Sequence, residues 1–214
     1  MAYIELNDCY KTINGTTILN NINLHFDENK IIGFVGKNGS GKTMLFKILS
    51  GLVKLSSGEL IINGQLVDNS KSFPQKVGVM IENNGLWPNL SAYDNLAVLS
   101  TARKGLSKEA IYDVISKVGL EQAGKKTFIK YSLGMKQRLL LAQAIMEKPD
   151  ILILDEPTNA LDKEGVALFK EIIEKERDRG ATVLIASHSL DDLDSFCDEI
   201  VLMDAGKATL LRNE

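Results

Sequence analysis

Residues 36–43 read GKNGSGKT, and they directly follow the apolar run IIGFV at residues 31–35. The eight residues match the pattern G-x-x-x-x-G-K-[ST], and the apolar run predicts a buried strand that leads into them. Glycine adopts positive φ at little cost, so successive backbone N–H groups can point into one concavity, and a following helix adds the positive end of its dipole. This strand–loop–helix arrangement predicts a phosphate-binding loop for a nucleoside triphosphate. The loop residues expected to bind the nucleotide are Gly36, Lys37, Asn38, Gly39, Ser40, Gly41, Lys42 and Thr43.

Two side chains of this loop and two later carboxylates predict the chemistry. Lys42 can reach the β- and γ-phosphates, and the hydroxyl of Thr43 can bind a magnesium ion. The fully apolar run at residues 151–154 predicts a buried parallel strand that delivers Asp155 at its C-terminal end, where ligands of such sheets bind. We expect Asp155 to hold the magnesium and Glu156 to polarise an attacking water.

The composition excludes several other classes of function. The chain has 214 residues, 44% of them hydrophobic and 25% charged, which is typical of a globular protein with a sizeable core. Its net charge is −3 and no long basic stripe appears, so we expect no nucleic-acid partner. No apolar run approaches the ~20 residues that span a bilayer. A partner must therefore supply any membrane span.

Cys9 and Cys197 lie far apart in the sequence, and we expect them to be free thiols in a reducing compartment.

The order of apolar patterns predicts a β-rich first third, a helical middle and a final third in which strands and helices alternate. Even spacing of Ile18, Ile22, Leu24 and Phe26 predicts one buried strand face, and Asn63-Gly64 predicts a hairpin turn. Alternating apolar strands and helices favour an α/β class with a buried parallel sheet. The expected helices span residues 42–50, 91–102, 107–118, 132–148, 163–179 and a short stretch near 190–196, and the later strands span 77–81, 151–154, 182–186 and 199–203.

Residues 131–138 read YSLGMKQR and stand between the two phosphate motifs. From the residues alone, Ser132 is suited to cap a helix whose unpaired N–H groups and dipole form an anion site. The phosphate loop, residues 131–138 and the strand that ends at Asp155 follow one another in this order along the chain. In this the chain resembles the ATP-binding-cassette (ABC) family, whose signature between the two phosphate motifs has the form L-S-G-G-Q. The spelling YSLGMKQRL is most similar to the short cassettes of bacitracin- and lantibiotic-type export and immunity transporters.

The resemblance implies a fold and an assembly. It implies an α/β P-loop NTPase with a mostly parallel core sheet, an N-terminal antiparallel β subdomain and an inserted α-helical subdomain. One ABC ATPase domain would span residues 1–214, with a catalytic lobe at about 1–85 and 149–214 and a helical signature lobe at about 86–148. Each ATP, with its Mg²⁺, would lie between the phosphate loop of one copy and Ser132 and Gly134 of another. ATP binding would close a homodimer, or a heterodimer with a related cassette, and hydrolysis would open it.

Four further residues match positions of the family pattern. Tyr10 occupies roughly the place of an aromatic residue that stacks on adenine, although a strand tyrosine can also be a core or surface residue. His188 matches a histidine that contacts the γ-phosphate and orients the water. Asn159 and Asp162 match the ends of a loop that touches the opposite subunit and positions Glu156.

Three residues depart from the family pattern. Glu82 stands where the family usually has a glutamine that binds magnesium and links to the membrane partner; a carboxylate is a competent magnesium ligand but cannot donate a hydrogen bond. Leu133 replaces a signature glycine and Met135 a glutamine that can contact the ribose held by the partner. We therefore expect a weaker nucleotide sandwich than in a full-signature cassette, but retained ATPase activity.

The resemblance implies the ATP-hydrolysing motor of a membrane exporter, cytoplasmic and peripheral on the inner face of the cell membrane, which drives a separate permease. The permease is expected to dock near Glu82 and residues 83–95. One alternative is a soluble cassette not coupled to transport, such as one that serves iron–sulfur cluster assembly. Another is a P-loop kinase for a small molecule, in which the signature at Ser132 would have no function.

Overall fold

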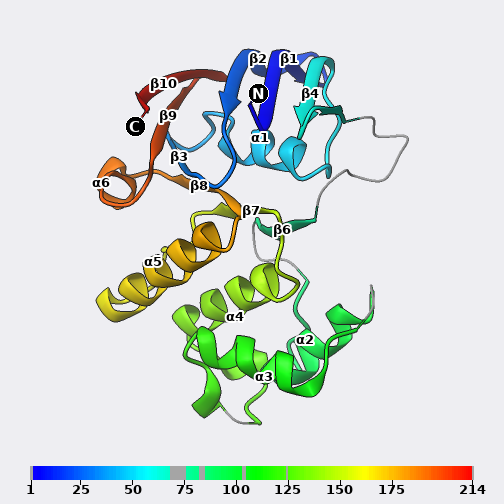
Figure 1. The fold of residues 1–214 in the computed structure, drawn as a ribbon, viewed down its shortest axis with the longest axis vertical. Coiled ribbons are helices and arrows are strands. Elements are labelled where there is room, and N and C mark those ends of the chain that lie inside the picture. Colours follow the sequence, from blue (N-terminus) through cyan, green and yellow to red (C-terminus); the bar gives the residue numbers. More distant parts are fainter. Residues whose placement is uncertain (1, 68–75, 82–84, 103–104, 124, 214) are drawn as a thin grey trace.

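The chain folds around a six-stranded sheet. The computed structural model, drawn in Figure 1, describes residues 2–67, 76–81, 85–102, 105–123 and 125–213. The strand order is β10-β9-β3-β8-β7-β6, parallel throughout except for β10, which pairs antiparallel with β9 at one edge. Strands β3 and β8 are buried along their whole length, as expected for strands covered on both faces. The mostly parallel core sheet is therefore confirmed. The strands are β3 (Ile31–Val35), β6 (Val77–Met80), β7 (Ile151–Asp155), β8 (Thr182–Ser187), β9 (Glu199–Asp204) and β10 (Lys207–Asn213).

The first third of the chain forms a second, antiparallel sheet in the order β2-β1-β4-β5. Asn63 and Gly64, both with positive φ, make the tight turn between β4 and β5, which confirms the predicted hairpin. Buried side chains of helix α1 pack with those of both sheets, so the helix that follows the phosphate loop is fixed in a common core. These elements are β1 (Ile4–Ile13), β2 (Thr16–Phe26), α1 (Lys42–Leu49), β4 (Ser57–Ile62) and β5 (Gln65–Leu66).

A bulge in β2 changes which side chains face the core. The register of β1 with β2 shifts between Cys9 and Lys11, and Asn21 has a positive φ of 55°. An extra residue on one strand reverses the alternation of faces beyond it. Leu19 is therefore fully buried while Ile18 is only half-buried, so the predicted even spacing is wrong at Ile18.

Three helices of the middle segment gather at the end of the molecule away from the antiparallel sheet (Figure 1). Each begins at a serine whose side-chain oxygen accepts the backbone N–H three residues later: Ser91, Ser107 and Ser132. These caps satisfy one of the unpaired donors at each helix start and confirm the predicted N-termini. The elements are α2 (Ala92–Ser100), α3 (Lys108–Lys117), η1 (Glu121–Ala123), η2 (Phe128–Lys130) and α4 (Leu133–Ile145), the two η elements being 3₁₀ turns.

Helix α4 meets the edge strand β6 through backbone atoms. A Cβ built on Gly78 would collide with the carbonyl oxygen of Ala144 and would lie 2.9 Å from Cγ of Pro149. Buried side chains form one cluster that runs through the helical segment to one face of the central sheet, and a second that joins the other face to the antiparallel sheet. The proposed division into a catalytic lobe and a helical signature lobe stays a prediction.

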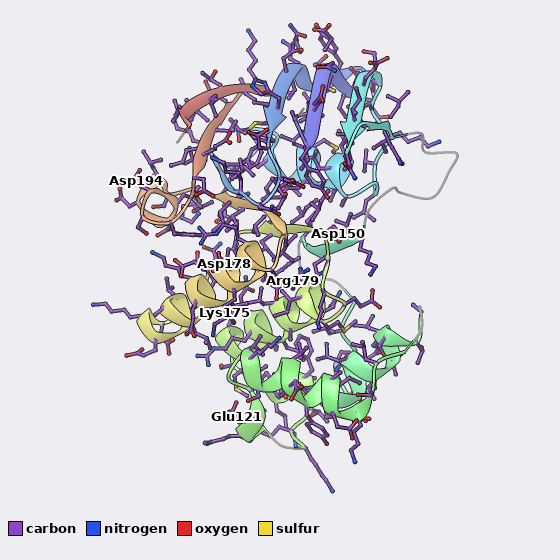
Figure 2. The ribbon with its side chains drawn as sticks, viewed as in Figure 1. Glu121, Asp150, Lys175, Asp178, Arg179 and Asp194 are labelled. Atoms are coloured by element: carbon purple, nitrogen blue, oxygen red, sulfur yellow. The ribbon has the colours of Figure 1, made fainter. Side chains whose placement is uncertain are left out.

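The last helices complete the sheet's cover. The outer side of α5 (Lys163–Asp178) is charged, and Lys175 of this helix is labelled in Figure 2. Lys175 is exposed and pairs with Glu171 at 2.6 Å. Helix α6 is short (Leu190–Asp194). Among the residues that the structure describes, no helix is both long and apolar enough to cross a membrane. Cys9 and Cys197 are buried and form no disulfide in the described chain, and burial raises the pKa of the Cys9 thiol to about 11.

Candidate functional site

The phosphate loop connects β3 to α1, as the sequence predicts. Gly41 stands at the start of α1 with φ 108°, a conformation that other residues rarely adopt. Gly36 is needed for a different reason, because a Cβ there would collide with the carbonyl oxygen of Met203 on β9. Lys42 is 6% exposed, and its Nζ donates to the carbonyl oxygens of Gly36 at 2.5 Å and Lys37 at 3.4 Å. The phosphate loop thus wraps around the side chain of Lys42, whose ammonium group binds carbonyl oxygens of the same loop.

Two oxygen ligands suited to magnesium meet beside this loop. The hydroxyl Oγ1 of Thr43, in the first turn of α1, donates to Oδ2 of Asp155 at 2.5 Å. Asp155 is the last residue of β7, at the carboxyl edge of the parallel sheet. A hydroxyl and a carboxylate at this spacing are hard oxygen donors, the kind that Mg²⁺ prefers, so the side chains fit the expected ion.

Glu156 and His188 lie in direct contact at the ends of neighbouring strands. Oε2 of Glu156 and Nδ1 of His188 are 2.9 Å apart, with the glutamate side chain 24% and the histidine side chain 57% exposed. Glu156 follows β7 and His188 follows β8, which pair through Asp155 and Ala186. Parallel pairing thus brings together two side chains that are 32 residues apart. Glu156 has a φ of 51°, unusual for a residue with a side chain.

A cavity of about 470 Å³ opens over the loop. Ile18, Met44 and Lys47 line it and were missed by sequence reasoning; Met44 and Lys47 continue the first turns of α1, a signal that could have found them. Tyr10 is not among the described residues that line this cavity, and its carbonyl oxygen accepts the N–H of Ser56 at 2.9 Å. Adenine stacking by Tyr10 stays a prediction. The predicted residues that do line the cavity are Asn38, Gly39, Ser40, Gly41, Lys42, Thr43, Asp155 and Glu156.

The signature segment stands apart from this cavity. Oγ of Ser132 accepts the N–H of Met135 at 3.2 Å, and the serine is exposed at the start of α4. Leu133, the next residue, is 62% exposed. In the part of the chain that the structure describes, neither Ser132 nor Gly134 contributes to the lining of the phosphate-loop cavity. The signature segment and the phosphate-loop cavity are therefore separate surfaces of the described chain, and a role for Ser132 and Gly134 in nucleotide binding stays a prediction.

The loop between Glu156 and α5 carries the two other predicted interface residues. The N–H of Asn159 donates to the carbonyl oxygen of Glu156 at 3.3 Å, and Oδ1 of Asp162 caps α5 by accepting the N–H of Gly165 at 2.8 Å. Both Asn159 and Asp162 are exposed, as a contact surface requires. The predicted magnesium ligand Glu82 lies outside the described residues.

Comparison with known proteins identifies the family. The family model described as ABC transporter matches residues 19–159. The chain belongs to the ABC transporter family. The relatives of this ABC chain include the ATP-binding protein YybJ of Bacillus subtilis, which is 48% identical over 95% of the chain and 94% of YybJ.

Two further relatives carry transport names. The lantibiotic transport ATP-binding protein SrtF of Streptococcus pyogenes is 40% identical over 97% of this chain and 89% of its own. The bacitracin transport ATP-binding protein BcrA of Enterococcus faecalis is 39% identical over 95% of this chain and 67% of its own. A solved structure described as the ATP-binding subunit of an ABC transporter has a TM-score of 0.85 at 24% identity, and covers 98% of this chain and 90% of its own. The resemblance read from the motifs, to lantibiotic- and bacitracin-type cassettes, is thereby confirmed.

Family membership fixes the general activity of this ABC subunit. The family binds and hydrolyses ATP, generally with Mg²⁺, and the chain is an ATP-binding subunit of the ABC transporter type. The roles of the individual site residues stay predictions, to which the structure adds their positions.

Proposed function

We propose that this ABC subunit hydrolyses ATP between two copies and thereby powers a separate membrane-spanning permease, which exports its substrate. The observation that carries the proposal is the separation of Ser132 from the cavity formed by Lys42, Asp155 and Glu156. Within a single chain the signature segment does not reach the phosphate loop. Each phosphate loop therefore needs the signature segment of a second chain to complete its site. The second copy is either identical or a related cassette.

The residues have distinct tasks in this reaction. Lys42 exchanges its bonds to loop carbonyls for the β- and γ-phosphates of ATP, where its charge opposes theirs. Magnesium, held by Thr43 and Asp155, supplies further positive charge when bound. Glu156 accepts a hydrogen bond from the attacking water, and Nδ1 of His188 holds the carboxylate through Oε2. Hydrolysis of this kind needs positioning and charge neutralisation rather than covalent catalysis.

The transport partner is proposed from the relatives and from one surface. SrtF and BcrA are named for lantibiotic and bacitracin transport, which supports an exporter over a soluble cassette for iron–sulfur assembly. Trp87 is 44% exposed, and its backbone is fixed to α2 because its N–H donates to Oδ1 of buried Asn95 at 2.7 Å. A rigid, exposed tryptophan in this segment suits a permease contact. The subunit would then lie on the inner face of the cell membrane.

A hydrolysis-blocked variant tests the proposal. With Glu156→Gln, ATP and Mg²⁺ should still bind, but the γ-phosphate should persist and the dimer should accumulate. We expect measurable ATPase activity in the wild type, almost none in the variant, and a doubled mass for the variant with ATP in light scattering. Lys42→Ala is the control, because it should neither bind ATP nor dimerise. A Glu156→Gln protein that stays monomeric at saturating ATP, alone and with its permease, would refute the shared site.

A further inference from the structure

Helix α4 is fastened to the loop that carries the catalytic glutamate. Nε2 of Gln137 donates to the carbonyl oxygens of Glu156 at 3.0 Å and Pro157 at 3.1 Å. One residue later, Nη2 of Arg138 lies 3.6 Å from Oδ1 of Asp162. Two adjacent side chains of the signature helix therefore hold both ends of the loop.

The bonds of Gln137 fall on a residue whose backbone needs support. Glu156 has a positive φ of 51°, a conformation that persists in a residue with a side chain only when its surroundings hold it. Its N–H donates to the carbonyl oxygen of Ala186 at 3.0 Å, and its own carbonyl oxygen also accepts the N–H of Asn159 at 3.3 Å. Gln137 donates both protons of its side-chain amide to this turn. Without them, the carbonyl oxygens of Glu156 and Pro157 lose their side-chain donor, and the turn loses its direct bonds to α4.

We propose that Gln137 is a positioning residue for the reaction: it holds the turn that aims the Glu156 carboxylate, and it connects this turn to Ser132 on the same helix. Gln137 lies five residues after Ser132, about 7.5 Å along the helix axis. A helix moves as a unit, so a displacement of its N-terminal end by a phosphate held in another copy reaches the catalytic turn of the same chain. The glutamate is then correctly aimed only when the signature is engaged. This inference rests on the proposed hydrolysis of ATP.

The test removes the amide donors and keeps the size of the side chain. Gln137→Leu should lower kcat by about 10- to 100-fold, because two hydrogen bonds that fix the general base are lost. Its dissociation constant for ATP should stay within twofold of wild type, because Gln137 is not among the described residues that line the cavity. Gln143→Leu is the matched control: it makes the same change six residues later in α4, where Gln143 lines a separate cavity together with Gly78 and Pro149. Its kcat should be unchanged.

A second variant and a mutant cycle separate positioning from folding. Gln137→Asn keeps the amide but shortens its reach by one methylene, and should lose kcat like Gln137→Leu while binding ATP normally. In single-turnover assays, adding Gln137→Leu to Glu156→Gln should cause no further loss, because Gln137 acts through Glu156. Multiplicative losses, a weakened ATP affinity that accounts for the whole effect, or equal losses in Gln143→Leu would overturn the inference. Failure of the proposed function looks different, because wild type itself would then hydrolyse ATP no faster than Glu156→Gln.

Discussion

Replacing Ser132 with alanine separates the structural role of the signature serine from its role in the reaction. In the free subunit the serine makes one helix cap, in which Oγ accepts the N–H of Met135 at 3.2 Å. Loss of such a cap costs about 1 kcal/mol of unfolding free energy. For a chain of this length that corresponds to a fall in melting temperature of about 2–4 °C. The folded subunit should therefore persist at room temperature.

The effect on hydrolysis should be larger than the effect on stability. In the shared site, the hydroxyl of Ser132 would donate to a phosphate oxygen of the nucleotide held by the other copy. A hydrogen bond to a charged group contributes about 1.5–3 kcal/mol, so its loss should lower ATPase activity about 10- to 150-fold. The ATP affinity of the monomer should stay unchanged, because the serine is not part of the cavity lining in the described chain.

Ser107 provides a matched control for this experiment. It caps α3 with the same geometry, because its Oγ accepts the N–H of Ala110 at 3.2 Å, and it is exposed like Ser132. Ser107→Ala should lose the same stability and keep its ATPase activity. Steady-state ATPase assays and thermal melts of both variants decide the question. Equal activity in the two variants would refute the reasoning that Ser132 binds phosphate in a second copy.

Two further predictions concern stability. Gly36→Ala should destabilise the fold by about 1–3 kcal/mol and weaken ATP binding, because the new methyl collides with the carbonyl oxygen of Met203; a melting temperature equal to that of wild type would contradict this. Burial raises the pKa of the Glu199 carboxyl above 4.5, although Lys30 lies 4.0 Å away. Since the folded state binds this proton more tightly, the contribution of Glu199 to stability is favourable below about pH 4.5 and is lost as the pH rises through the folded-state pKa. Glu199→Gln should therefore be more stable than wild type at pH 8, with a gain that shrinks towards pH 4.5 in thermal melts, and a gain independent of pH would contradict the cause.

Local signals in the sequence predicted most of the fold. The Asn63-Gly64 turn and the serine caps of α2, α3 and α4 have short-range physical causes, and each appears where the residues indicate. The apolar run before Asp155 predicted a buried strand, and its parallel neighbour β8 then placed His188 beside Glu156.

The features that the sequence did not predict depend on contacts between distant segments. The antiparallel edge strand β10 is the exception, because it pairs with the preceding strand β9 across a local turn at Ala205-Gly206. The burial of Leu19 in place of Ile18 depends on a bulge at Asn21, which only the pairing with β1 creates. The bond from Gln137 to the turn at Glu156 joins residues 19 apart in sequence, and no spacing rule announces it.

The contact of Gly78 with the carbonyl oxygen of Ala144 fixes the position of one end of α4. Side chains can rotate to absorb a small shift, but two backbones in direct contact cannot. Ser132 lies at the opposite end of the same helix, about 18 Å from Ala144. A rotation of α4 by about 10° around Ala144 would move Ser132 by about 3 Å, roughly the length of one hydrogen bond. In the proposed dimer, a slight tilt of α4 at the sheet edge would therefore make or break the contact of Ser132 with the other copy.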